Sequence, residues 1–286
     1  MLKSEMLKKL ERINDLPTLP AIAMEVNRML QNDDVSIDSL CEVIEKDQAI
    51  VTKLLKLSNS AFFGLRFKVK NVREAAMLLG FSTVRNVVVS VSVIKSFCGI
   101  KSIEGLNIED FWKHSISVAI IGKELAKQSE LAQPDEAFLG GLLHDIGKIV
   151  MIQHFQEEFK DVWERLQVSN ELFFQAEEDR QIAGHALIGG ILAQKWKLPE
   201  LMVHAIRYHE KPSVSCSDYN LVLIVHMANM LANALQTDGK VNKKFLVSIH
   251  KDAIAKMKPQ TSNINSWYPS IRAEINEACE FFMEGR

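Results

Sequence analysis

The chain has 286 residues, a length that suits one or two domains with a sizeable core. Hydrophobic residues make up 47% of it and charged residues 24%, which is ordinary for a soluble globular protein. The formal net charge of −2 excludes a general attraction to nucleic acid or to anionic membranes.

Cysteine usage and the N-terminal residues both bear on location. The cysteines are scattered without a Cys-x-x-Cys pair, which favours reduced thiols and excludes a zinc knuckle. The first residues are rich in Lys and Glu and contain no apolar signal core. We therefore expect a cytoplasmic protein that binds neither nucleic acid nor membrane.

Apolar residues recur at helical spacing through the first half of the chain. Pro20 suits a first helical turn, and Ser36 is a suitable N-cap. The β-branched run Val87–Ile94 would fit a strand, but its long helical neighbours favour a buried helix. The spacing predicts helices at Leu2–Ile13, Ala21–Leu30, Ser36–Glu45, Ala49–Leu57, Val72–Leu79 and Ser82–Ser96.

The second half continues the same pattern. Its predicted helices are Phe111–Gln128, Asp135–His144, Ile146–His154, Phe155–Gln167, Glu171–Arg180, His185–Lys195, Pro199–Tyr208, Tyr219–Thr237 and Ile271–Met283. The segment Tyr219–Thr237 carries no formal charge and is long enough to cross a bilayer. However, polar residues line one stripe of it, including His226 and Asn229, so we interpret it as a core helix facing a polar site.

The fold class that follows is all-α, with two helical lobes and no sheet of consequence. The segment Gly99–Asn107 is the best internal boundary. We accordingly expect an N-terminal helical lobe at residues 1–104 and a second helical region with the C-terminal helices at 105–286.

The adjacent pair His144-Asp145 is the most informative feature of the sequence. An imidazole nitrogen beside a carboxylate oxygen is a pair of ligands that divalent cations accept. Apolar residues precede the pair and Ile-Gly-Lys follows it, which places it at the edge of a buried helix. Next to a bound cation, Lys148 could contact a phosphate. The alternative is a polar cluster whose side chains only bond one another.

Further histidines lie where they could converge with this pair. His114 lies on an amphipathic helix, and His185 opens a helix of small residues. His209 follows the predicted helix Pro199–Tyr208, and His226 lies on the polar stripe. The order resembles that of the HD superfamily of metal-dependent phosphohydrolases, in which a histidine, a His-Asp pair and a distant aspartate form the site. The resemblance implies that His114, His144 and Asp145 are ligands and places Asn229 at the fourth position, where the superfamily has aspartate. A neutral amide oxygen there predicts a weakly held ion.

About two-thirds of the chain resembles the HDOD family, the HD-related output domain of bacterial signalling proteins. The resemblance covers roughly residues 14–212 and rests on Leu16–Pro20, Ile44–Ile50, Leu54–Gly64, Ala75–Gly80, Trp196–Pro199 and Tyr208-His209. It implies a helical N-terminal lobe with an HD-like helical core, in a family whose members often act by binding after loss of catalytic residues.

A related branch, the HD-GYP phosphodiesterases, uses additional histidines for further metals. His185 and His209 could correspond to two of them and hold a second ion. Tyr208 stands where that branch often has another histidine, and no Gly-Tyr-Pro follows. A competent HD-GYP phosphodiesterase is therefore not expected.

Two functions remain open from the sequence. The first is a regulatory module that recognises a signalling protein or a small nucleotide-like ligand, with Asn59, Phe62 and Phe63 as the partner-binding loop. The second is a phosphohydrolase acting on a nucleotide or phosphodiester, with Lys148 at the phosphate. The altered ligand set favours the first. The metal would be Fe, Mn, Ni, Mg or Zn, and no organic cofactor is expected; the oligomeric state is left open.

Overall fold

The computed structural model describes residues 1–13, 16–29, 35–59, 67–97, 107–214, 218–235 and 241–283. The regular structure in these ranges is helical, as predicted, and the β pairing found there is an isolated bridge between Leu235 and Val241. The chain forms two compact units, each made from two stretches of sequence. Unit 1 contains residues 1–18 and 101–267, and unit 2 contains residues 19–100 and 268–286.

Unit 2 holds six helices in its described residues: α2 (Ala21–Met29), α3 (Ile37–Ile44), α4 (Gln48–Ser58), α5 (Val72–Leu79), α6 (Phe81–Phe97) and most of α18 (Ile264–Met283), which begins in the residues of unit 1. Ser36 caps α3, as the sequence predicts, because its hydroxyl accepts the backbone N–H of Ser39. In α6 the β-branched run is helical and buried all round, which explains why it shows no amphipathic pattern.

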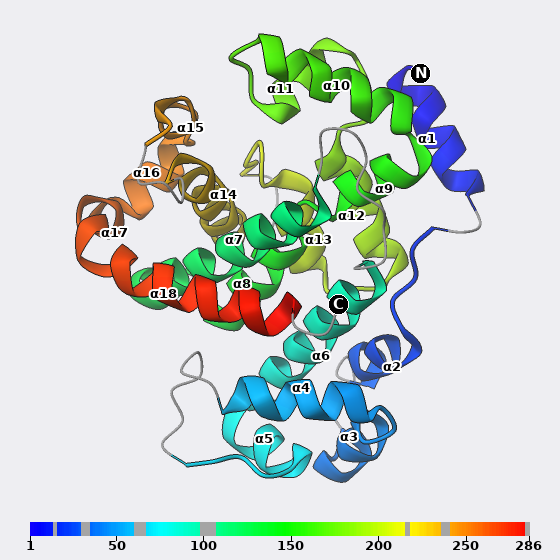
Figure 1. Ribbon diagram of the computed structural model, residues 1–286, viewed down its shortest axis with the longest axis vertical. Coiled ribbons are helices and arrows are strands. Elements are labelled where there is room, and N and C mark those ends of the chain that lie inside the picture. Colours follow the sequence, from blue (N-terminus) through cyan, green and yellow to red (C-terminus); the bar gives the residue numbers. More distant parts are fainter. Residues whose placement is uncertain are drawn as a thin grey trace. The chain divides into compact units, whose positions relative to one another are not determined.

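Unit 1 holds α1 (Lys3–Arg12) and the rest of the described helices (Figure 1). They are α7 (Ile108–Ser129), α8 (Pro134–Leu143), α9 (Ile146–His154), α10 (Gln156–Val168), α11 (Phe173–Asp179), α12 (His185–Lys195), α13 (Glu200–Tyr208), α14 (Tyr219–Ala234), α15 (Lys243–Val247), α16 (Lys251–Lys256) and α17 (Lys258–Ser262). Helix α7 packs against α8 and α14, and these three helices form the centre of the unit.

Glycines allow the helices around the centre to approach closely. A Cβ added to Gly141 in α8 would lie 2.8 Å from the backbone of Ala119 in α7. One added to Gly147 in α9 would lie 1.9 Å from the carbonyl oxygen of His185, at the start of α12. Such distances exclude any side chain, so these glycines set how near α7 lies to α8 and how near α12 lies to α9.

Helix α1 lies against parts of unit 1 that are distant in sequence. The side chains of Met6 and Leu10 are buried, and the Met6 sulfur accepts the backbone N–H of Ala183. The backbone N–H of Lys3 bonds the carbonyl of Gln181, and the Lys9 amine bonds the carbonyl of His154. The amphipathic pattern of α1 thus covers the segment that leads into α12.

The C-terminal region differs from the sequence-based expectation in two respects. The short helices α15, α16 and α17 were not predicted, because five or six residues are too few for a periodic pattern. The last helix begins at Ile264 and not at Ile271, and it contains Pro269. Because a proline inside a helix removes one backbone hydrogen-bond donor, Pro269 favours a helix that begins after it. The structure instead continues the helix through Pro269.

No helix in the described part of the chain is both long and apolar enough to cross a bilayer. Helix α14, the segment that raised the question, is mostly buried within the protein, and His226 and Asn229 on its polar stripe are buried with it.

Candidate metal centre

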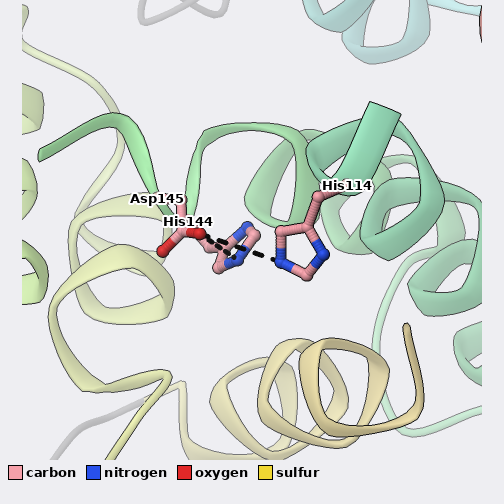
Figure 2. Close-up of side chains that lie close together, drawn as sticks. All are labelled: His114, His144 and Asp145. Carbon is pink, nitrogen blue, oxygen red and sulfur yellow. Dashed lines mark ion pairs between the residues drawn. The ribbon is translucent and has the colours of Figure 1, made fainter. Parts of the chain in front are cut away.

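Two groups of side chains that could each hold a metal ion meet at one carboxylate, that of Asp145. The first group is His114, His144 and Asp145. His114 comes from the first half of α7, and His144 and Asp145 form the turn between α8 and α9. The Asp145 Oδ2 lies 3.3 Å from Nε2 of His144 and 3.7 Å from Nε2 of His114, so the three side chains point toward one another (Figure 2).

The second group is Asp145, His185 and His209. His185 is the first residue of α12, and His209 follows the last residue of α13. The Asp145 Oδ1 lies 3.2 Å from Nε2 of His185 and 3.7 Å from Nε2 of His209. The close packing at Gly147 brings α12 to this position. Asp145 therefore presents one oxygen to each group, an arrangement suited to two neighbouring ions.

Backbone hydrogen bonds fix the tautomers of two of these histidines. Nδ1 of His144 donates to the carbonyl of Gly141 at 2.6 Å, and Nδ1 of His209 donates to the carbonyl of Ile206 at 2.8 Å. Each carbonyl lies three residues earlier in the chain, in the last turn of the preceding helix. The remaining nitrogen, Nε2, is directed at the centre, and in the neutral ring it carries the lone pair through which imidazole binds metals.

His185 is oriented by a carboxylate. Both oxygens of the buried Glu177 are used: Oε1 accepts the backbone N–H of His185 at 2.7 Å, and Oε2 accepts Nδ1–H at 2.8 Å. Burial disfavours a charged His185, but Glu177 and Asp145 outweigh it and hold the pKa of His185 well above its usual range. A carboxylate behind an imidazole is a common support for metal-binding histidines.

Asp145 is ionised despite its burial. Desolvation opposes the charge, but His144 and the Lys148 amine, which donates to Oδ2 at 2.7 Å, hold the pKa of Asp145 well below its usual range. Lys148 also lies 4.7 Å from the centre of the Phe173 ring. The lysine expected at a substrate phosphate thus contacts the shared carboxylate directly.

Asn229 lies beside the first group, on α14. Its Oδ1 is 3.1 Å from Nε2 of His114 and also accepts Nδ2–H of Asn233 at 2.8 Å. An amide oxygen can only accept, so Nε2 of His114 donates in this arrangement. Burial, with His144 nearby, lowers the pKa of His114 to about 3, so the imidazole is neutral.

The donor set fits a divalent metal. Nε2 of His144 and Oδ1 of Asp145 are buried without an aligned hydrogen-bond partner, which is unusual for polar atoms and is relieved by an ion. Imidazole and carboxylate ligands suit Zn, Fe, Mn and related ions, and the arrangement leaves the choice of metal open. The centre is enclosed: His144, His185 and His209 are fully buried and Asp145 is 1% exposed, whereas the His114 side chain is 23% exposed.

Two buried carboxylates at the centre were missed in the sequence. Glu177 orients His185, and Glu210, directly after His209, lies 3.4 Å from Nε2 of His209. Glu177 lies in an ordinary charged stretch and has no signal in one sequence. Glu210 did have a signal, since it adjoins a candidate ligand.

The expected partner-binding loop is described only at its first residue. Phe62 and Phe63 lie outside the described residues. Asn59 ends α4, and its side chain bonds both backbone groups of Val69: Oδ1 accepts the N–H and Nδ2 donates to the carbonyl. Asn59 therefore connects the described residues 35–59 to the described residues 67–97 through these two hydrogen bonds.

A helical chain with a His-Asp pair at a shared polar centre is of the HD class. The family model for the HDOD domain matches residues 16–212, and the chain belongs to this family. The family resemblance seen in the sequence is confirmed.

Similar proteins agree with the fold. A structure of an HDOD domain protein of unknown function from Geobacter sulfurreducens is 25% identical, covers 94% of this chain and 95% of its own, and superposes with a TM-score of 0.77. The structure of a candidate phosphohydrolase from Shewanella amazonensis SB2B is 24% identical, with 98% of both chains covered and a TM-score of 0.74, which supports the fold. An uncharacterized protein of Treponema pallidum (strain Nichols) is 30% identical over 232 residues; these are 80% of this chain but 44% of that relative's length.

Proposed function

We propose that the chain is a regulatory binding module of bacterial cytoplasmic signalling, in which a metal-binding HD centre serves as the structural core. The partner would be a signalling protein or a small nucleotide-like ligand. The burial of the centre carries this proposal. A catalytic metal needs a coordination position open to substrate, whereas His144, His185 and His209 have no exposed surface. The Lys148 amine is already bonded to Asp145, and Asn229 adds no charge. The free thiol of Cys41 suits a reducing compartment.

A metal-dependent phosphohydrolase is the second candidate. It is favoured by the unpartnered atoms of His144 and Asp145 and by the partial exposure of His114, which gives the first group one accessible side. A metal held by His114, His144 and Asp145 would polarise a phosphoryl oxygen and lower the pKa of a bound water. Lys148 would turn from Asp145 to the phosphate, and His185 and His209 would hold the substrate or a second ion.

A hydrolysis screen separates the two candidates. Cyclic dinucleotides and nucleoside phosphates are incubated with the full chain and added Mn²⁺, Fe²⁺ or Ni²⁺, and metal content is measured on protein purified without chelator. We expect bound metal and no turnover. A rate of about 1 per second or more that disappears in both His144→Ala and Asp145→Ala would overturn the preferred function, because the loss in both variants excludes a contaminating phosphatase.

Ligand binding gives a second, independent measurement. We expect a nucleotide-like ligand or partner to bind at the segment that begins with Asn59 and includes Phe62 and Phe63. Asn59→Ala removes both hydrogen bonds to Val69 and should weaken binding while leaving metal content unchanged. His144→Ala should show the opposite pattern. If His144→Ala abolishes binding in a folded protein and Asn59→Ala does not, the partner site lies at the metal centre.

A further inference from the structure

The Glu210 carboxylate is nearly buried, and its hydrogen bonds do not account for both of its oxygens. It follows His209 at the end of α13, and its side chain is only 10% exposed. Its Oε1 lies 3.4 Å from Nε2 of His209 and 3.6 Å from Nε2 of His185. These are the nitrogens that face Asp145 from the other side. The two imidazoles of the second group thus lie between two carboxylates.

The second oxygen of the Glu210 carboxylate, Oε2, has no hydrogen-bond partner. Oε2 of Glu210 is buried without a hydrogen-bond partner, as is Oδ1 of Asp145. An unpaired buried carboxylate oxygen is destabilising unless a cation or a donor reaches it. Burial opposes the charge on Glu210, yet His185 and His209 hold its pKa well below its usual range.

The neighbour on α14 is compatible with this anion because it is neutral. Nδ2 of Asn229 lies 3.5 Å from Oε1 of Glu210, at the limit of a hydrogen bond. An aspartate at 229 would place a second carboxylate at that distance and would repel Glu210. The negative charge absent from position 229 is therefore present at position 210, on the side of the second group.

We propose that Glu210 is the fourth ligand of the second group, and that a divalent ion binds there before it binds at His114 and His144. The assignment rests on the metal centre of the proposed function. With Glu210, the second group offers two imidazoles and two carboxylates, a set that neutralises the ion. The first group offers two imidazoles, the neutral Asn229 and a share of Asp145. Since an anionic ligand binds a divalent ion more tightly than an amide oxygen, the second group is the tighter site.

Co²⁺ titration of the full, chelator-treated chain tests the assignment, because the visible absorption of Co²⁺ changes with its ligands. The wild type should bind one equivalent tightly and a second weakly. Glu210→Gln, nearly isosteric, should weaken the tight step by about 10-fold or more and alter its spectrum. Glu200→Gln is the matched control: it removes the same charge from an 80% exposed side chain at the other end of α13 and should titrate like the wild type.

Asn229→Ala should weaken the second step and leave the first unchanged. Far-ultraviolet circular dichroism checks that each variant is folded. Where Glu210→Gln does not fold, anomalous scattering from wild-type crystals with one equivalent of Co²⁺ decides: the peak should lie among His185, His209 and Glu210. A tight step unaffected in folded Glu210→Gln, or a peak at His114 and His144, overturns the Glu210 assignment alone. Absence of Co²⁺ uptake by the wild type overturns the metal centre of the proposed function as well.

Discussion

The side-chain oxygen of Asn229 determines which ring nitrogen of His114 carries the proton. Its Oδ1 accepts from Asn233 and is 3.1 Å from Nε2 of His114. Because Nε2 of His114 donates there, its lone pair is absent until the proton moves to Nδ1 or to solvent. A metal entering the first group must therefore change the tautomer of His114 as well as displace an amide.

Replacing Asn229 with Asp should raise the affinity of the first group for a divalent ion. The added carboxylate supplies an anionic oxygen, and its repulsion of Glu210 is relieved when a cation binds. We expect the weaker Co²⁺ step to tighten by about 10-fold or more, measured by titration calorimetry. Asn220→Asp adds the same charge at the other end of α14, where residue 220 accepts from the Lys256 amine, and serves as the control. Unchanged affinity in Asn229→Asp would place residue 229 outside the site.

His226 predicts a pH dependence that is separate from metal binding. Its Nδ1 donates to the carbonyl of His209, and its Nε2 accepts the backbone N–H of His250, so both bonds require the neutral ring. Burial lowers the pKa of His226 from 6.5 to about 4. Below pH 6.5 the unfolded chain binds a proton that the folded chain excludes, and the free energy of unfolding falls until the pH reaches about 4.

The measurement compares the wild type with His226→Gln in urea unfolding of chelator-treated protein across that pH interval. The variant has no titrating group at 226, so its free energy of unfolding should fall less steeply with decreasing pH. Parallel pH profiles for the two proteins would show that His226 titrates normally in the folded state.

At the residue scale, the sequence predicts those candidate ligands that adjoin one another or follow a known spacing. His144 and Asp145 are neighbours, and His114 and Asn229 follow the order of the HD superfamily. Glu177 could not be assigned, because a carboxylate on a helix is ordinarily solvated, whereas Glu210 adjoins a candidate ligand and was overlooked. Whether such a carboxylate turns inward depends on the position of the next helix, which one sequence does not contain.

Between elements, the centre depends on the contact of α9 with α12. Gly147→Ala would place a methyl group 1.9 Å from the His185 carbonyl, and neither backbone can yield without moving His185 away from Asp145. We expect a loss of about 1–3 kcal/mol in the free energy of unfolding, measured in urea, and weaker Co²⁺ binding at the second group.

Gly140→Ala in α8 is the matched control for this substitution. Its added Cβ would lie 3.2 Å from Cγ2 of Val225 and 3.4 Å from Cβ of Ala205, contacts that small side-chain shifts can relieve. We expect its stability and metal binding to remain near those of the wild type. Equal effects of the two substitutions would mean that the α9–α12 contact has no special role.

Helix positions were the most predictable feature of the fold, since period and caps are local. The helix expected over the β-branched run of α6 is confirmed. Its residues favour strands by intrinsic preference, but their burial on all sides of the helix outweighs that preference. The short helices α15 to α17 were missed for want of length. The contacts of α1 with Gln181 and Ala183 could not be foreseen, because periodicity gives a buried face and not its partner.

For the whole molecule, the division into two units predicts unequal effects of truncation. Four side chains of α18 that lie in unit 2 are buried: Ile271, Ile275, Ala278 and Phe282. Ending the chain at Trp267 should expose their partners and speed amide hydrogen exchange in the unit 2 helices. Exchange in α7, α8 and α14 of unit 1 should change little. Uniform acceleration across both units would show that the two unfold as one.

Because unit 2 is made of two separate stretches of sequence, its parts are synthesised at different times. Residues 19–100 leave the ribosome before residues 101–267 of unit 1, and residues 268–283 of α18 follow only after these. At typical translation rates the delay between them is about 10–40 s, far longer than a helix takes to form. The apolar residues of α2 to α6 spend that interval without their final partner. Chaperone dependence of this protein should therefore reside in unit 2 and end when α18 emerges.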